Sequence, residues 1–237
     1  MLGLAIHTSS PQLGLMLQGT DEMGKAISRY QVWDLGRDVS SHLHVKLMEF
    51  MGETRWQNLS FVAVAKGPGG FTGTRVGVVT ARTLAQQLQV PLFGVSSLAA
   101  MGAQTRAALH VAQHSIQHTT EHTTEHTTEH TTEHTTSKDV AIAMTAKREA
   151  VFGAIYRSAN DGDFTAVRLD EAMPIDRWAA VLAQWNQPFV EVAISAGEGV
   201  AESVQGVMEI AIARYQKGDR PDWSTVMPFY GQHPVHR

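Results

Sequence analysis

The fold is decided by the segment Ala63-Val64-Ala65-Lys66-Gly67-Pro68-Gly69-Gly70-Phe71-Thr72-Gly73-Thr74-Arg75-Val76-Gly77. The segment begins inside a short, nearly continuous apolar run over residues 59–65, which is typical of a buried parallel strand. Glycines and a proline follow and predict a sharp turn, after which a helix is expected over about 74–88. The sequence therefore predicts a strand, a glycine loop and a helix in direct succession.

The glycine loop has two physical interpretations. A loop between a buried strand and a helix N-terminus presents free N–H groups to an anion. Alternatively, the glycines only permit a sharp turn and close packing. The loop lacks the Gly-Lys-Ser/Thr ending of a Walker A loop, and it is not a GxGxxG loop with a suitably placed acid. The candidate anion site consists of Gly67, Pro68, Gly69, Gly70, Phe71, Thr72 and Gly73.

The first hundred residues indicate a mixed α/β fold. Strands are expected over 2–8, 13–19, 25–33, 59–65 and 91–95. A helix is expected where Leu43, Leu47, Phe50 and Met51 recur at helical spacing, and another over 97–109. The order is three strands, a helix, a strand, a helix and a strand. This order predicts antiparallel and parallel strands within one sheet.

The second half of the chain repeats much of this order. Strands are expected over 140–145, 151–157, 164–169 and 189–195, with one helix starting at Pro174 and a last helix over 199–217. Two runs of three strands, each followed by helical material, indicate internal duplication. The predicted organisation is a first lobe over 1–109 completed by 199–217, an insertion over 110–138, a second, smaller lobe over 139–198 and an irregular tail over 218–237.

Composition excludes several classes of protein. The chain has 237 residues, of which 43% are apolar and 18% charged, and this composition is enough for a real core. The absence of cysteine excludes disulfides and thiolate zinc sites, and fits a reducing cytoplasm. No window is apolar enough for a transmembrane helix, and the N-terminus does not resemble a signal peptide. We therefore expect a cytoplasmic protein without a membrane partner.

A low-complexity tract stands between the two halves. From His118 to Thr136 the sequence repeats His-Thr-Thr-Glu. Four-residue spacing drifts by about 40° per step around a helix, so the histidines would not form one stripe. We expect an insertion without a metal site.

The net charge of the chain is 19 − 23 = −4, and four of the acids lie in this tract. The chain outside the tract is nearly neutral, which argues against a protein that binds nucleic acid on its own.

The motifs quoted above resemble those of one known family. Residues 67–77 look like the GPGSFTGxRxG signature of the TsaB family, also called YeaZ. Residues 4–9 resemble the LAIDTS strand of that family, and 91–98 resemble its later strand and turn. Residues 141–156 resemble its hairpin, which has the form xIDARxxEVYxAxY, and 228–230 partly resemble its PxYLR ending.

This resemblance implies the actin-like ATPase fold, also called the ASKHA fold, with two ribonuclease H-like lobes and mixed β-sheets. It also implies a noncatalytic partner of a paralogue, TsaD. With the ATPase TsaE, this pair transfers a threonylcarbamoyl group to the adenosine beside the anticodon of tRNAs that read codons beginning with A. The TsaB subunit scaffolds TsaD and can self-associate through the same surface, so tRNA would be contacted only indirectly.

The chain departs from the family pattern where ligands would be needed. His7 stands where the family usually has Asp, and neutral imidazole is a poor ligand for magnesium. Thr145 and Lys147 replace the Asp and Arg of the later hairpin. Two metal-binding histidines of the catalytic paralogue fall, by position, on Ser97 and Met101. We therefore assign no catalytic residue, no metal and no cofactor.

Two enzymatic alternatives stay open. The first is an active ATP-dependent transferase or a peptidase-like enzyme of the same fold, with candidate nucleophiles Ser9, Ser10, Ser96 and Ser97. No His–Asp partner set for these serines is evident. The second is a small-molecule sugar or acetate kinase of this fold, which the missing acids disfavour.

The expected partner surface is formed by two helices, over about 42–52 and 74–88. The second carries two apolar rows, of which one must cover the sheet and the other is available. We expect the small residues Gly77, Ala81 and Ala85 to let a neighbouring helix approach closely. The candidate interface consists of Leu43, Leu47, Phe50, Met51, Val76, Val79 and Thr83.

Overall fold

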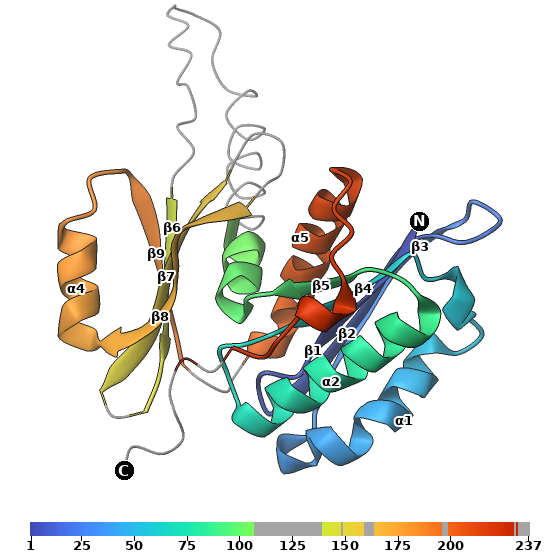
Figure 1. Ribbon diagram of the computed structural model, residues 1–237. Helices are drawn as coiled ribbons and strands as arrows, with labels where there is room; N and C mark the ends of the chain where they lie inside the picture. Colours follow the sequence, from blue (N-terminus) through green and yellow to red (C-terminus); the bar gives the residue numbers. More distant parts are fainter. Residues whose placement is uncertain (107–138, 148, 159–163, 196–198, 230, 232–237) are drawn as a thin grey trace, which may run out of the picture.

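The computed structural model describes residues 1–106, 139–147, 149–158, 164–195, 199–229 and 231. The predicted insertion over 110–138, with its histidine repeat, lies outside these residues. Two β-sheets stand side by side with helices between and around them (Figure 1). The expectation of an α/β fold with mixed sheets is confirmed.

The first sheet has five strands in the order β3-β2-β1-β4-β5. Its central strand β1 pairs antiparallel with β2 and parallel with β4, as the predicted order requires. Every residue of β1 and β4 is buried, because helices cover both faces of the sheet. The strands are β1 (Leu2–His7), β2 (Gln12–Thr20), β3 (Ala26–Asp34), β4 (Phe61–Ala65) and β5 (Leu92–Val95).

Helices α1 (Val39–Met51) and α2 (Phe71–Leu88) cover one face of this sheet (Figure 1). Helix α2 begins three residues before its predicted start, directly after the glycine loop. Its buried row contains Val78, Ala81 and Ala85, which pack with leucines of β1 and β2. The small residues expected to admit a neighbouring helix therefore face the chain's own sheet, and that expectation was wrong.

The apolar residues predicted for the partner surface of α1 belong to the core instead. Leu43 is completely buried, and Leu47, Phe50 and Met51 are nearly so. They pack with β1, β2 and β4 in one hydrophobic cluster. The physical reason is that α1 has one continuous apolar stripe, and a helix lying on a sheet uses that stripe to cover it. The assignment of Leu43, Phe50 and Met51 to an exposed partner surface is corrected, whereas Leu47 also lines a groove between α1 and α2.

The second sheet has four strands in the order β8-β7-β6-β9. Strand β6 pairs antiparallel with β7 and parallel with β9, which repeats the pattern of the first sheet. Helix α4 (Ile175–Ala183) packs on its outer face through the buried Trp178. The strands are β6 (Asp139–Thr145), β7 (Ala150–Ser158), β8 (Phe164–Pro174) and β9 (Phe189–Ile194).

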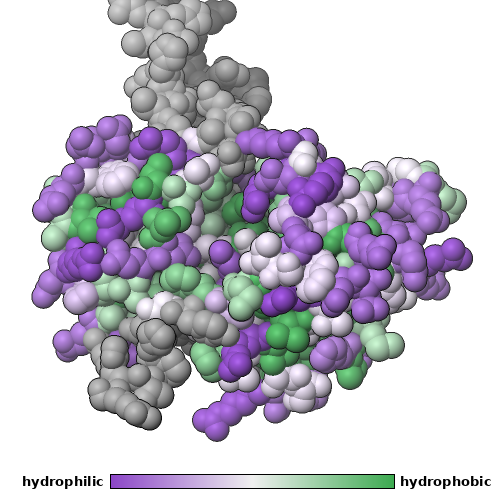
Figure 2. All heavy atoms as spheres, in the orientation of Figure 1, coloured by the Kyte–Doolittle hydropathy of each residue, from purple (hydrophilic) through white to green (hydrophobic). Residues whose placement is uncertain are grey.

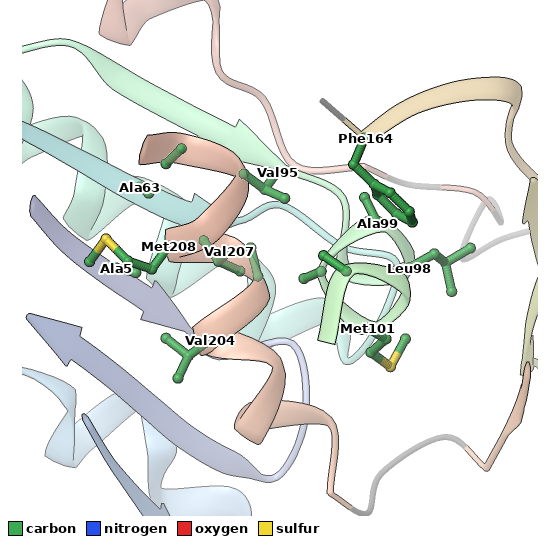
Figure 3. Close-up of a cluster of buried hydrophobic side chains, with 14 of the residues drawn as sticks. Ala5, Ala63, Val95, Leu98, Ala99, Met101, Phe164, Val204, Val207 and Met208 are labelled. Carbon is green, nitrogen blue, oxygen red and sulfur yellow. The ribbon is translucent and has the colours of Figure 1, made fainter. Parts of the chain in front are cut away.

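Two helices lie between the sheets and join them into one core. One is α5 (Val204–Gln216), which follows the 3-10 turn η3 (Val200–Ser203), and the other is described over residues 97–106. Figure 3 shows Val204, Val207 and Met208 of α5 beside Ala5 and Ala63 of the first sheet. The same cluster includes Phe164 of the second sheet. Helix α5 thus packs on the first sheet, against β1, β2, β4 and β5.

A polar contact also links the two lobes. Ser96, just after β5, donates a hydrogen bond of 2.5 Å to Asp170 on β8. Tyr156 on β7 donates to the other oxygen of the same carboxylate. Burial, and then the charge of Asp170, raises the pKa of Tyr156, so the phenol keeps its proton. Because these residues come from different lobes, the contact fixes how the lobes meet.

The C-terminal segment runs from α5 along the free edge of the first sheet (Figure 1). Leu92 of β5 donates a hydrogen bond to the carbonyl oxygen of Pro221 at 3.2 Å. The 3-10 turn η4 (Trp223–Thr225) follows, and Val226 is buried beside Gly94. This segment therefore covers the edge of β5, which would otherwise be open to pairing with another chain.

None of the described helices is both long and apolar enough to cross a membrane.

Candidate functional site

The glycines of the loop allow α2 to approach β1 very closely. A Cβ atom on Gly69 would lie 2.2 Å from the Ser9 carbonyl oxygen, and one on Gly73 would lie 2.2 Å from that of Thr8. On Gly77 it would lie 2.0 Å from the Thr8 hydroxyl oxygen. Real side chains do not tolerate such distances. The packing interpretation of the glycines is therefore supported by the geometry, whether or not a ligand binds.

The backbone groups of the loop are partly engaged within the protein. The Gly70 N–H donates to the Ser9 carbonyl oxygen at 2.6 Å, and the Gly67 carbonyl oxygen accepts from Ser97 N–H at 2.8 Å. Gly67 and Pro68 are buried, Gly73 is half-buried, and Gly69, Gly70, Phe71 and Thr72 are exposed. A ligand could therefore reach only part of the predicted anion site, and its anion-binding role stays a prediction.

The end of β1 carries a buried histidine. The side chain of His7 is completely inaccessible, and neither ring nitrogen has a hydrogen-bond partner among the described residues. Burial lowers the pKa of His7 from 6.5 to about 3, so the ring is neutral at physiological pH. Within the described part of the chain, no group of three or more His, Cys, Asp or Glu residues could hold a metal ion.

A shallow apolar groove lies between α1 and α2. Its volume is about 460 Å³, and its surface includes Met48, which is 71% exposed, and Val79, which is 60% exposed. Figure 2 shows hydrophobic side chains gathered over these helices at the lower right of the molecule. The lining residues are His44, Leu47, Met48, Trp56, Arg75, Val76, Val79, Thr80, Thr83 and Leu84.

The groove brings together part of the predicted partner surface. Val76, Val79 and Thr83 of α2 line it, as does Leu47 at its floor. The other α1 residues predicted for this surface lie in the core beneath. Six lining residues were not predicted from the sequence: His44, Met48, Trp56, Arg75, Thr80 and Leu84. A signal for Met48 was present, because it is an apolar residue outside the buried stripe of α1.

Known proteins resemble this chain in sequence over part of its length. The family model described as "TsaD: tRNA N6-adenosine threonylcarbamoyltransferase" matches residues 43–114. The tRNA threonylcarbamoyladenosine biosynthesis protein TsaB of Bacillus subtilis is 37% identical over 105 residues, which are 44% of each chain. TsaB of Buchnera aphidicola from Acyrthosiphon pisum is 25% identical over 153 residues, or 62% of this chain and 58% of that one. The chain thus spans about half the length of the curated relatives that it matches.

Solved structures resemble the chain over nearly its whole length. A Pseudomonas aeruginosa protein described as similar to peptidase YeaZ has a TM-score of 0.67 and 19% identity, covering 98% of this chain and 99% of that one. YeaZ from the same organism has a TM-score of 0.65 and 20% identity, covering 97% and 99%. The chain is similar to TsaB/YeaZ proteins, in sequence over part of its length and in fold over nearly all of it. Its fold is the actin-like, ribonuclease H-like fold of these structures.

Compared with the TsaB/YeaZ pattern, the chain carries the departures noted in the sequence. Thr145 lies at the exposed end of β6, and Lys147 follows in the turn before β7. Ser97 and Met101 are buried on the helix over 97–106, so neither side chain is open to a ligand. The resemblance implies that His7, Thr145, Ser97 and Met101 stand where ligands would be needed for catalysis, and this stays a prediction.

Proposed function

We propose that the chain is a noncatalytic scaffold subunit of the complex that adds a threonylcarbamoyl group to adenosine in tRNA. Its curated relatives are named for that biosynthesis. The observation that carries the scaffold role is the apolar groove between α1 and α2, with Met48 and Val79 exposed at its sides. Exposed apolar side chains that gather in one groove mark a protein interaction site.

The proposed partner is a TsaD-like catalytic paralogue. Both sides of the groove are helices, so a helix pair of similar shape on the partner would bury the exposed apolar side chains of both subunits. A second copy of this chain could occupy the same groove in the absence of the paralogue. A TsaE-like ATPase would complete the complex, and tRNA would be contacted only indirectly, in the cytoplasm.

The noncatalytic character rests on the chemistry of the strand ends. Magnesium prefers oxygen ligands, and a buried neutral imidazole at His7 supplies none. Ser97 and Met101 stand where the resemblance would place metal-binding histidines. We therefore expect the purified chain to hydrolyse no ATP and to bind no magnesium nucleotide tightly.

The alternative is an active ATP-dependent transferase or a peptidase. Ser96 donates to Asp170, and Ser10 donates to the Gln12 carbonyl oxygen at 3.4 Å. Ser9 and Ser97 have no side-chain hydrogen-bond partner among the described residues. In this part of the chain no histidine is paired with any of the four serines, as nucleophilic catalysis would require.

Co-purification from native extract tests the proposal. The tag should not be polyhistidine, because the natural histidine repeat could itself retain the chain on nickel. We expect a TsaD-like protein to be captured, and to be lost when Val79→Asp is introduced. Recovery of no such paralogue would contradict the scaffold role. Calorimetry with magnesium and ATP is the second arm, and micromolar magnesium-dependent binding would favour the enzymatic alternative.

A further inference from the structure

A second, smaller cavity lies where the C-terminal segment crosses the edge of the first sheet. It has a volume of about 160 Å³ and is lined by Lys66, Gly94, Arg214 and Thr225, among others. Its residues come from three parts of the chain: the end of β4 with β5, helix α5, and the segment around η4. The cavity is separate from the groove between α1 and α2, with which it shares no residue.

Lys66 is the unusual feature of this cavity. Its side chain is only partly exposed, and no carboxylate of the described residues lies within ion-pair distance of its ammonium group. Lysine is seldom withdrawn from solvent without a partner of opposite charge. A methyl-sized group on Gly94 would lie 3.5 Å from Cδ of Lys66, so the stem of the lysine is held against β5.

The neighbouring charges do not neutralise Lys66. Arg214 donates from Nε to Asp219 at 2.9 Å, and its guanidinium group lies 5.3 Å from the ring centre of Phe93. Asp222 accepts hydrogen bonds from the backbone and hydroxyl of Ser224, at 2.8 and 2.5 Å. Asp219 is thus paired with Arg214, and neither acid of the segment forms an ion pair with Lys66, so the positive charge of Lys66 is not neutralised by a direct partner among the described residues.

We propose that this cavity binds one phosphate group. Lys66 supplies a point charge with three donors, and Arg214 still has terminal N–H groups with which to bind phosphate oxygens. The volume is well below the roughly 300 Å³ at which small-molecule sites begin, which favours a single phosphate group over a whole nucleotide. The site accepts a single phosphate whose remaining substituents, if any, lie outside the protein.

Two sources can provide such a group. One is a free phosphate or phosphate monoester. The other is a phosphodiester of RNA, which would add a direct RNA contact to the proposed function, in which tRNA is otherwise reached only through the partner. A single phosphate contact is compatible with the nearly neutral charge of the chain outside the histidine tract. Such a contact positions an RNA but does not hold the RNA without other contacts. The phosphate chemistry is common to both sources.

The first arm of the test uses inorganic phosphate and the full chain labelled with nitrogen-15. At constant ionic strength, we expect phosphate to shift the amide signals of Lys66, Gly94 and Thr225. Lys66→Gln and, independently, Arg214→Gln should each weaken binding about tenfold, the usual worth of a charged hydrogen bond. Lys25→Gln is the matched control, because Lys25 is exposed on the remote turn between β2 and β3.

Absence of phosphate-dependent shifts at these amides would overturn the proposal, as would binding that neither Gln variant weakens. Circular dichroism of each variant excludes misfolding as the cause of a loss. The second arm titrates a tRNA transcript. If RNA supplies the phosphate, Lys66→Gln should reduce the salt slope of binding by about 0.7 to 0.9. An unchanged slope with intact phosphate binding assigns the site to a free phosphate. Neither arm depends on capture of a TsaD-like partner, so the two proposals fail separately.

Discussion

The hydroxyl of Thr8 donates a hydrogen bond of 2.8 Å to the carbonyl oxygen of Gly73. This bond ties the end of β1 to the first turn of α2, across 65 positions of sequence. It is possible only because Gly73 and Gly77 have no side chain at the contact. The glycine loop therefore sets the position of α2, and with it the groove on the opposite face of that helix.

The first prediction concerns this contact. Gly73→Ala places a Cβ atom 2.2 Å from the Thr8 carbonyl oxygen, so β1 and α2 must separate. We expect the free energy of unfolding to fall by about 1–3 kcal/mol, as in other overpacked cores. Urea denaturation measures it. Thr83→Ala is the control, because Thr83 lies on the exposed face of the same helix and should change stability little. Equal stability of the two variants would contradict the packing role of Gly73.

The second prediction concerns pH and His7. Its pKa is 6.5 when unfolded and about 3 when folded, so the unfolded chain binds more protons between these values. Stability therefore rises with pH through this window and is lost as pH falls below about 6.5. The loss from this one group reaches at most about 1.4 kcal/mol per pH unit.

Thermal unfolding of wild type and His7→Asn, measured from pH 7 to pH 4, checks this. The variant should lose less stability on acidification, because its side chain cannot be protonated in the unfolded state. His42→Gln is the control, since His42 is exposed on α1 and should leave the acid dependence unchanged. Parallel curves for His7→Asn and wild type would show that His7 is not the titrating group.

The third prediction concerns the groove. Val79→Asp puts an unpaired charge into the proposed contact, which should cost several kcal/mol of binding. We expect co-purification with the partner to be abolished, while the far-ultraviolet circular dichroism stays that of the wild type. Leu169→Asp is the matched control, because Leu169 is 77% exposed on β8 of the other lobe. A folded Val79→Asp variant with unchanged affinity would place the interface elsewhere.

A fourth prediction separates the two faces of α1. Leu43→Asp should unfold the chain, because Leu43 is completely buried in the core. Met48→Asp should leave the chain folded and weaken only partner binding, because Met48 lies at the groove surface. Melting temperature and co-purification, measured on both variants, distinguish the outcomes. A folded Leu43→Asp variant would contradict the assignment of Leu43 to the core.

A fifth prediction concerns the histidine repeat. Deletion of residues 118–136 should leave the melting temperature and partner binding unchanged, because the repeat contains no apolar residue that could contribute to a core. Calorimetric melting and co-purification of the shortened chain are the measurements. A large drop in melting temperature would show that the repeat contributes to the fold.

The sequence by itself determined the local units and their order. Apolar runs, period-two alternation and turn residues predicted each described strand to within a few residues, apart from the longer β8, because these signals act over short distances. The glycine signature predicted the strand–loop–helix unit. The resemblance of residues 4–9 to the LAIDTS strand implies that His7 stands where metal-binding members of the fold have a carboxylate.

Only the tertiary structure decided which side of each helix is free. Helix α2 has two apolar rows, and the sequence left open which one covers the sheet. The close approach of Gly77 to Thr8 turns Val78, Ala81 and Ala85 inward and leaves Val79 outside. Likewise, the contact of Ser96 with Asp170 and the shared cavity of Lys66 and Arg214 join residues far apart in the chain. Such relationships depend on how the elements pack in three dimensions, and no local periodicity records that packing.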